Sequence, residues 1–179
     1  HYIGIEAYGL VGFYVMLLSL LGLVGSSFCG SLTREIARLD GLEDTARDQR
    51  DLVRTLEVVY VVLAVMAGTT AVLLAPWIAN NWVKRDQLAV SAVCQAVRLM
   101  GLSIMFHFIS VFNQAGLMGL QRQVLQNILR ASLAAFRCIG AIGVLAWISN
   151  SVQAFFLWQL IILALEAAVF RIFLWRVLP

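Results

Sequence analysis

The chain has 179 residues, of which 61% are hydrophobic and 13% charged, and its formal net charge is +3. An average soluble domain is roughly half apolar and about a quarter charged, so this composition excludes an ordinary soluble enzyme and a disordered chain. Its three cysteines, none of them in a CxxC pair, exclude a disulfide scaffold. We therefore predict an all-α fold, a polytopic transmembrane helix bundle of about five spans.

The spans follow from uncharged runs that are long enough to cross a bilayer, which takes about 20 mostly apolar residues in a helix. Pro76 predicts the end of the second span, and Ser149-Asn150-Ser151 divides the last apolar stretch into two. The predicted spans cover about residues 9–31, 57–79, 93–118, 125–148 and 152–174.

The connection after the first span, residues 33–56, alternates acidic and basic residues at helical spacing, which predicts an amphipathic loop of one or two short solvated helices. Lys and Arg gather on this connection, on the connection after the third span and near the C-terminus, whereas the other side has only Lys84, Arg85 and Arg98. The positive-inside rule therefore places the 33–56 loop in the cytoplasm. Because the number of spans is odd, we expect residues 1–179 to be a single transmembrane domain, a fragment of a longer protein.

Two ionisable residues fall at bilayer depth, where a charge is costly and usually faces an interior or a cavity. Arg137 lies near the middle of the fourth span, and Glu166 lies near the middle of the fifth. A short turn joins these spans, so we predict an antiparallel Arg137–Glu166 pair or a polar cavity that both residues share. Such a pair either fixes packing only or takes part in substrate binding or conformational switching.

The third predicted span holds further polar residues. His107 lies near its centre, and Gln114 follows seven residues later on the same face. His107 is either packed and hydrogen-bonded or lines a cavity, and it has no partner at metal-ligand spacing, so no metal site is predicted. Arg98, near the outer end, either extends to the interface or attracts an anion at a cavity mouth.

No catalytic motif occurs in the chain: HExxH, GxSxG, a phosphate-binding P-loop and the paired acids of glycosidases are all absent. We therefore predict that the chain is not an enzyme and needs no cofactor. Its basic residues flank apolar spans, which indicates orientation in a membrane and not nucleic-acid binding.

Three short segments resemble motifs of the polysaccharide flippases, the O-antigen and capsule repeat-unit transporters of the multidrug/oligosaccharidyl-lipid/polysaccharide exporter superfamily. Gly4-Ile5-Glu6-Ala7-Tyr8-Gly9 is similar to their "LGxExYG" loop. Leu32-Thr33-Arg34-Glu35-Ile36-Ala37-Arg38 is similar to their "LxREIAR" segment. Gln114-Ala115-Gly116-Leu117-Met118-Gly119-Leu120-Gln121-Arg122 is similar to their "GxLxGLQR" segment.

The resemblance implies a transporter of two six-helix lobes, of which this chain supplies helices two to six of the first. It implies a multi-pass protein of the bacterial inner membrane that flips an undecaprenyl-pyrophosphate-linked oligosaccharide by alternating access. Membrane lipid and the missing helices of its own chain are then its other partners. Gly25 stands where the family carries an Asp, which is a departure from the pattern.

From depth and charge, we expect substrate-binding residues in a polar cavity, with arginines attracting the anion. These are Arg137, Arg98, Glu166, His107 and Gln114. A cation-coupled drug or small-molecule exporter of the same superfamily is the alternative, with Glu166 and His107 as coupling groups. A membrane enzyme and a non-transporting membrane subunit stay open as well.

Overall fold

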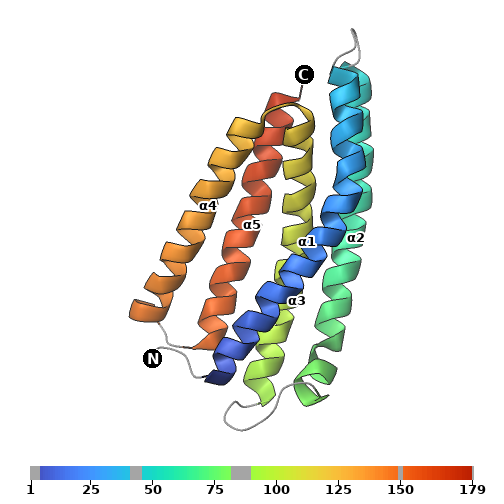
Figure 1. The fold of residues 1–179 in the computed structure, drawn as a ribbon. Coiled ribbons are helices and arrows are strands. Elements are labelled where there is room, and N and C mark those ends of the chain that lie inside the picture. The colour runs from blue at the N-terminus through green and yellow to red at the C-terminus, as the bar shows by residue number, and fades with distance from the viewer. Residues whose placement is uncertain (1–4, 41–45, 82–89, 149–150, 179) are drawn as a thin grey trace.

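The structure is a computed structural model, and it describes residues 5–40, 46–81, 90–148 and 151–178. The described residues form helices and no strand, which confirms the predicted all-α bundle (Figure 1). The elements in chain order are α1 (Ile5–Asp40), α2 (Ala46–Asn81), α3 (Val90–Gly119), α4 (Gln123–Gly143), a π-helical turn η1 (Val144–Ile148) and α5 (Val152–Val177). Gly4, Lys84, Arg85, the tip of the 33–56 connection and residues 149–150 of the predicted break lie outside the described residues.

Four of the described helices have stretches long and apolar enough to cross a membrane, and α1 contributes a shorter apolar stretch, Gly9–Leu23. The four stretches are Ala46–Ile78, Val93–Gly119, Gln123–Trp147 and Val152–Val177. Many large apolar side chains are exposed on the surface of the bundle. In water such a surface would favour aggregation, whereas in a bilayer it contacts lipid. The chain is therefore a multi-pass membrane protein.

The first two helices are longer than the spans predicted for them. α1 continues to Asp40 and α2 begins at Ala46, so the separate short helices predicted within residues 33–56 are wrong. No glycine or proline interrupts residues 31–40, and Glu35 pairs with Arg38 one turn away, so the helix continues beyond its apolar part. Pro76 lies inside α2, which ends only at Asn81.

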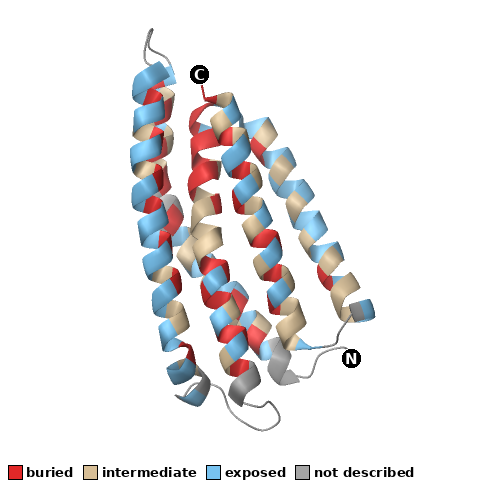
Figure 2. Cartoon of the chain, turned by 180° about the vertical axis from the view of Figure 1, so that it is seen from behind, coloured by how far each residue is buried: buried red, intermediate tan, exposed pale blue. Residues whose placement is uncertain are grey.

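The helices run up and down, so one end of the bundle collects the C-terminal ends of α1, α3 and α5 with the start of α4 (Figure 1). We name it the C-terminal end; it is the side for which the charge distribution predicts the cytoplasm. α3 is the central helix and packs against α1, α2 and α5. α4 packs mainly on α5, and among its residues only Gln126 and Ala141 are buried, as its largely pale blue and tan ribbon in Figure 2 shows.

Two apolar clusters make up the interior. One lies at the C-terminal end around Ile36, Phe112 and Phe170. The other lies toward the opposite end around Tyr14, Met100 and Phe156. Where the bundle reaches water, the burial of apolar surface stabilises these clusters. Polar side chains of α3 and α5 occupy the region between them.

Close helix contacts depend on small residues, as is typical of membrane bundles. A Cβ atom at Gly119 of α3 would lie 2.8 Å from Cβ of Ile36 and 3.0 Å from the Thr33 carbonyl oxygen of α1. The same contact carries a hydrogen bond, in which the Thr33 hydroxyl donates to the carbonyl of Ala115 over 3.1 Å. Glycine at 119 therefore permits the approach of α1 to α3.

The turn from α3 to α4 determines the direction in which α4 starts. Gln121 has a φ of 55°, in the left-handed region that usually ends a helix. The amide of Arg122 donates to the carbonyl of Leu117, and the amide of Gln121 donates to that of Met118, so the last carbonyls of α3 are bonded. α4 then begins at Gln123.

Candidate functional site

A cluster of polar side chains joins α3 to α5. The Ser110 hydroxyl donates to Oε1 of Glu166 over 3.0 Å, and Nε2 of Gln114 donates to the same oxygen over 3.2 Å. Nε2 of Gln114 also lies 2.9 Å from the Ser110 hydroxyl oxygen. Ser110 is fully buried, and Glu166 and Gln114 are partly exposed. The cluster therefore holds a carboxylate between the two apolar clusters.

α4 contributes a polar stripe beside this cluster. Gln126, Arg130 and Arg137 lie within about 40° of one another around the helix, at about 100° per residue. Nε2 of Gln126 approaches Oε1 of Gln114 at 3.5 Å, a long and weak hydrogen bond. This contact places the stripe on the side of α4 that faces the bundle. We name these three residues the α4 polar stripe.

His107 lies on α3, seven residues before Gln114 and on the same face of that helix. His107 points toward α1, because a Cβ atom at Gly22 would lie 3.6 Å from its Nε2. The described residues of α1 and α4 are not packed against each other. The imidazole therefore faces α1, whereas the α4 polar stripe meets α3 through Gln126 and Gln114.

Neither arginine of the stripe has a carboxylate partner among the described residues. Arg130 is exposed and Arg137 is half-buried, and no carboxylate oxygen of the described chain lies within 4 Å of either guanidinium. The direct Arg137–Glu166 ion pair predicted from the sequence is thus not formed.

The register of α4 on α5 explains why that pair is not formed. Nε1 of Trp158 donates to the Arg137 carbonyl oxygen over 3.1 Å, so the Arg137 backbone lies beside Trp158. Trp158 and Glu166 are eight residues apart on α5, which is about 12 Å of helix rise. Counting residues from the α4–α5 turn predicts nearly equal depths for Arg137 and Glu166. The packing of Trp158 against α4 shifts these two residues apart along the bundle.

Of the five predicted site residues, the structure brings Gln114 and Glu166 into direct contact. Arg137 lies on the α4 polar stripe, His107 lies on the same face of α3 as Gln114, and Arg98 lies apart from them. Arg98 lies on α3 nine residues before His107, which at about 100° per residue puts it on the opposite side of the helix. It is exposed. The structure therefore removes Arg98 from the candidate site.

Sequence reasoning missed three members of the site: Ser110, Gln126 and Arg130. Ser110 is a common type of residue in membrane helices, and its role is visible only from its contact with Glu166. Gln126 and Arg130 carried a usable signal, because their spacing to Arg137 is that of one helix face. A helical projection of residues 123–147 reveals the stripe.

Gly25, where the resemblance expects an Asp, lies against apolar neighbours. A Cβ atom there would lie 3.5 Å from Cγ1 of Val111 and 3.9 Å from Cε1 of Phe108, both on α3. A carboxylate at this position would face these side chains. The glycine therefore suits the local packing, and the charge of the region comes from α4 and α5.

A second interhelical contact, an ion pair, joins α2 to α5 nearer the C-terminal end. Nε of Arg171 donates to Oε1 of Glu57 over 2.6 Å. The Glu57 side chain is only 9% exposed, whereas that of Arg171 is 59% exposed. Glu57 is the first residue of the predicted second span, and the structure places it in an interhelical contact.

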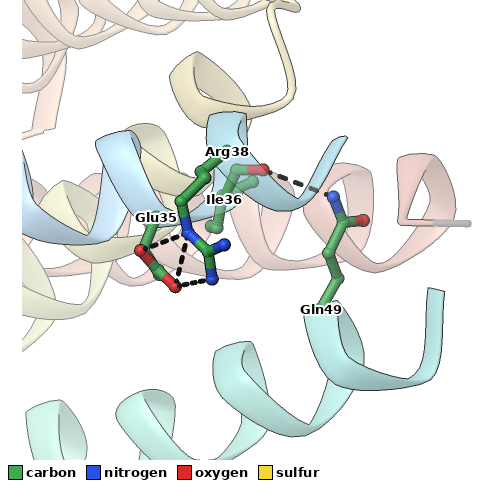
Figure 3. A network of polar contacts seen from close by, with 4 residues as sticks. All are labelled: Glu35, Ile36, Arg38 and Gln49. Carbon is green, nitrogen blue, oxygen red and sulfur yellow. Dashed lines mark hydrogen bonds and ion pairs between the residues drawn. The ribbon is translucent and has the colours of Figure 1, made fainter. Parts of the chain in front are cut away.

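The segment that resembles "LxREIAR" carries a surface pair and an interhelical hydrogen bond (Figure 3). Nη2 of Arg38 lies 2.6 Å from Oε1 of Glu35. Nε2 of the buried Gln49 on α2 donates to the Ile36 carbonyl over 3.3 Å. This segment therefore fixes the end of α1 against α2, away from the polar cluster. A hydrogen bond from Arg38 lowers the pKa of the Glu35 carboxyl.

We expect Arg38→Gln to raise the pKa of Glu35 toward its ordinary value, because the hydrogen bond to the carboxylate is lost. The matched control is Arg34→Gln, since Nε of Arg34 donates to the Gly30 carbonyl and not to Glu35. The measurement is a carbon NMR titration of the carboxyl group. The stabilisation from this pair is present above the unfolded-state pKa and is lost as pH falls through the lowered pKa. An unchanged titration in Arg38→Gln would show that the pair does not form in solution.

The described residues contain no group of three or more His, Cys, Asp or Glu that could hold a metal ion. The site is therefore built for hydrogen bonding and charge: two arginines, one carboxylate, two amides, a hydroxyl and an imidazole. No protein-family model, curated protein or solved structure was found to match the chain.

Proposed function

We propose that this chain is part of a membrane transporter that moves an anionic, lipid-linked sugar across the bilayer. The observation that supports it is the pair of arginines on α4, Arg130 and Arg137, which share a helix face with Gln126 and have no carboxylate partner among the described residues. An unpaired cation at bilayer depth is costly, so such residues usually serve a substrate path or a water-filled cavity. An anionic headgroup supplies the missing counter-charge.

The resemblance to polysaccharide flippases makes the proposal more specific. We infer that the substrate is an oligosaccharide on undecaprenyl pyrophosphate, and that the protein works in the bacterial inner membrane. In alternating access, the polar region opens first to one side of the membrane and then to the other. Arg137 attracts the diphosphate, His107 and Gln114 offer hydrogen bonds, and Glu166 fixes the cluster on α5.

The alternative is a cation-coupled exporter of small molecules, which the Glu166 cluster favours. A carboxylate beside a hydroxyl and an amide at bilayer depth suits a proton or a hard cation. The two functions differ in their dependence on ion gradients. An exporter moves a soluble substrate only with a proton or sodium gradient, and it needs no lipid-linked substrate.

The test uses the full-length protein in vesicles with a fluorescent lipid-linked diphosphate sugar in the outer leaflet. Movement to the inner leaflet protects the fluorophore from a membrane-impermeant reductant. We expect Arg137→Gln to slow this movement at least about tenfold, since a hydrogen bond to a charged group contributes about 1.5–3 kcal/mol. Arg176→Gln is the control, because Arg176 is exposed near the end of α5, away from the site. Equal rates in wild type and Arg137→Gln would contradict the proposal.

A further inference from the structure

Arg130 has no role in the sequence-based site, yet it occupies a distinctive position on α4. It lies seven residues after Gln123, where α4 begins, and seven residues before Arg137. At about 1.5 Å per residue, the two arginines lie about 10 Å and about 21 Å along the helix from its start. Gln126 precedes both on the same face. Polar groups therefore follow one another from the C-terminal end of the bundle into its middle.

The opposite face of α4 has a contrasting character. Its apolar side chains are 59–75% exposed and lie about 160–220° around the helix from Gln126. These side chains are Val124, Ile128, Ile139 and Ile142. One helix thus presents a polar stripe toward the bundle and an apolar face away from it. This suits a substrate with a charged headgroup and a long hydrocarbon tail, because each part meets a surface that resembles it.

The two arginines lie on one face of α4 and not on two separate ones. Gln126, on the same face, contacts Gln114 of α3. Arg130 is exposed and has no carboxylate partner among the described residues. Oε1 of Glu166 accepts hydrogen bonds from Ser110 and Gln114, which connects this contact to α5.

From this arrangement we infer that Arg130 is a second anion-binding residue, which receives a diphosphate headgroup from the C-terminal end of the bundle and passes it to Arg137. The inference rests on the proposed function and deepens it. The headgroup moves along the α4 polar stripe while its tail stays beside the apolar face of the same helix. The Cα atoms of the two arginines are about 10 Å apart along the helix axis. Because both side chains are long, a headgroup that moves between them stays close to a guanidinium group.

The experiment measures binding of farnesyl diphosphate, a short prenyl diphosphate, to the full-length protein in detergent by calorimetry. We expect Arg130→Gln to weaken binding about 10- to 100-fold, as does Arg137→Gln, from the usual strength of a charged hydrogen bond. Arg130→Lys keeps the charge and is expected to retain affinity within a few-fold of wild type. Arg176→Gln, outside the stripe, is expected to bind as wild type does.

Two results separate this inference from the proposed function. If Arg130→Gln binds as tightly as wild type while Arg137→Gln is weakened, the role of Arg130 is refuted and the proposed function stands. If wild type does not bind the probe, or if Arg137→Gln binds it unchanged, the proposed function itself fails. Thermal unfolding of each variant shows whether it is folded. If Arg130→Gln does not fold, a folded Arg130→Met that binds as tightly as wild type refutes the inference.

Discussion

Replacing Gly140 by alanine is expected to lower the free energy of unfolding by about 2 kcal/mol, although alanine favours helices. A Cβ atom at this position would lie 1.9 Å from Cζ2 and 2.6 Å from Cε2 of Trp158. The indole must therefore move, and its hydrogen bond to the Arg137 carbonyl is lost. Overpacking costs about 1–3 kcal/mol and the hydrogen bond about 1 kcal/mol, against a gain of about 1 kcal/mol in helix propensity.

Gly143→Ala is the matched control on the same helix. No heavy atom of the described residues lies within 4 Å of a Cβ at Gly143, so this variant keeps only the gain in helix propensity. We expect it to be neutral or slightly more stable in chemical unfolding of the purified protein in detergent. The double variant Gly140→Ala/Trp158→Leu should recover part of the loss, because the smaller side chain removes the clash. Equal stabilities of Gly140→Ala and Gly143→Ala would contradict the contact between α4 and α5.

Replacing Arg171 by alanine is expected to cost about 2 kcal/mol of unfolding free energy. It leaves the Glu57 carboxylate, which is 9% exposed, without its partner at 2.6 Å. Breaking a buried pair costs about 3–5 kcal/mol, and water around the 59% exposed Arg171 side chain reduces that figure here. The pair also links α2 to α5, two helices whose described residues otherwise pack little against each other.

A double-mutant cycle tests this pair most sharply. Removing both charges, in Glu57→Leu/Arg171→Leu, should cost less than Arg171→Ala alone, because no unpaired carboxylate stays buried. Arg176→Ala is the control for loss of a basic residue on the same helix. If the loss in Glu57→Leu/Arg171→Leu equals the sum of the losses in Glu57→Leu and Arg171→Leu, the two residues do not interact in the folded protein.

Single-helix patterns predicted the helices at the third and fifth spans closely, because charge-free length marks such helices. The third span was predicted at 93–118 and α3 covers Val90–Gly119, and the fifth was predicted at 152–174 where α5 covers Val152–Val177. The same patterns failed beyond the apolar runs. Charged residues that continue a helix into water lack the signal that marks a span, so the lengths of α1 and α2 were underestimated.

The candidate site was predicted only in part, because its geometry depends on the register between helices. The face shared by His107 and Gln114 follows from periodicity alone. The distance between Arg137 and Glu166 depends on how Trp158 packs on Gly140, which no pattern within one helix contains. The position of Arg98 opposite His107 does follow from periodicity, and a helical projection excludes it.

Photo-crosslinking tests the central claim most directly: that a diphosphate headgroup binds along the α4 polar stripe, on the side of α4 that faces α3. The probe is a prenyl diphosphate with a diazirine next to the phosphates, incubated with the full-length protein in vesicles and located by mass spectrometry. We predict adducts near His107, Arg130 and Gln114, and their loss when unlabelled prenyl diphosphate competes. Adducts confined to the apolar face of α4, at Val124, Ile128, Ile139 or Ile142, would show that the headgroup does not enter the polar region and would contradict the account.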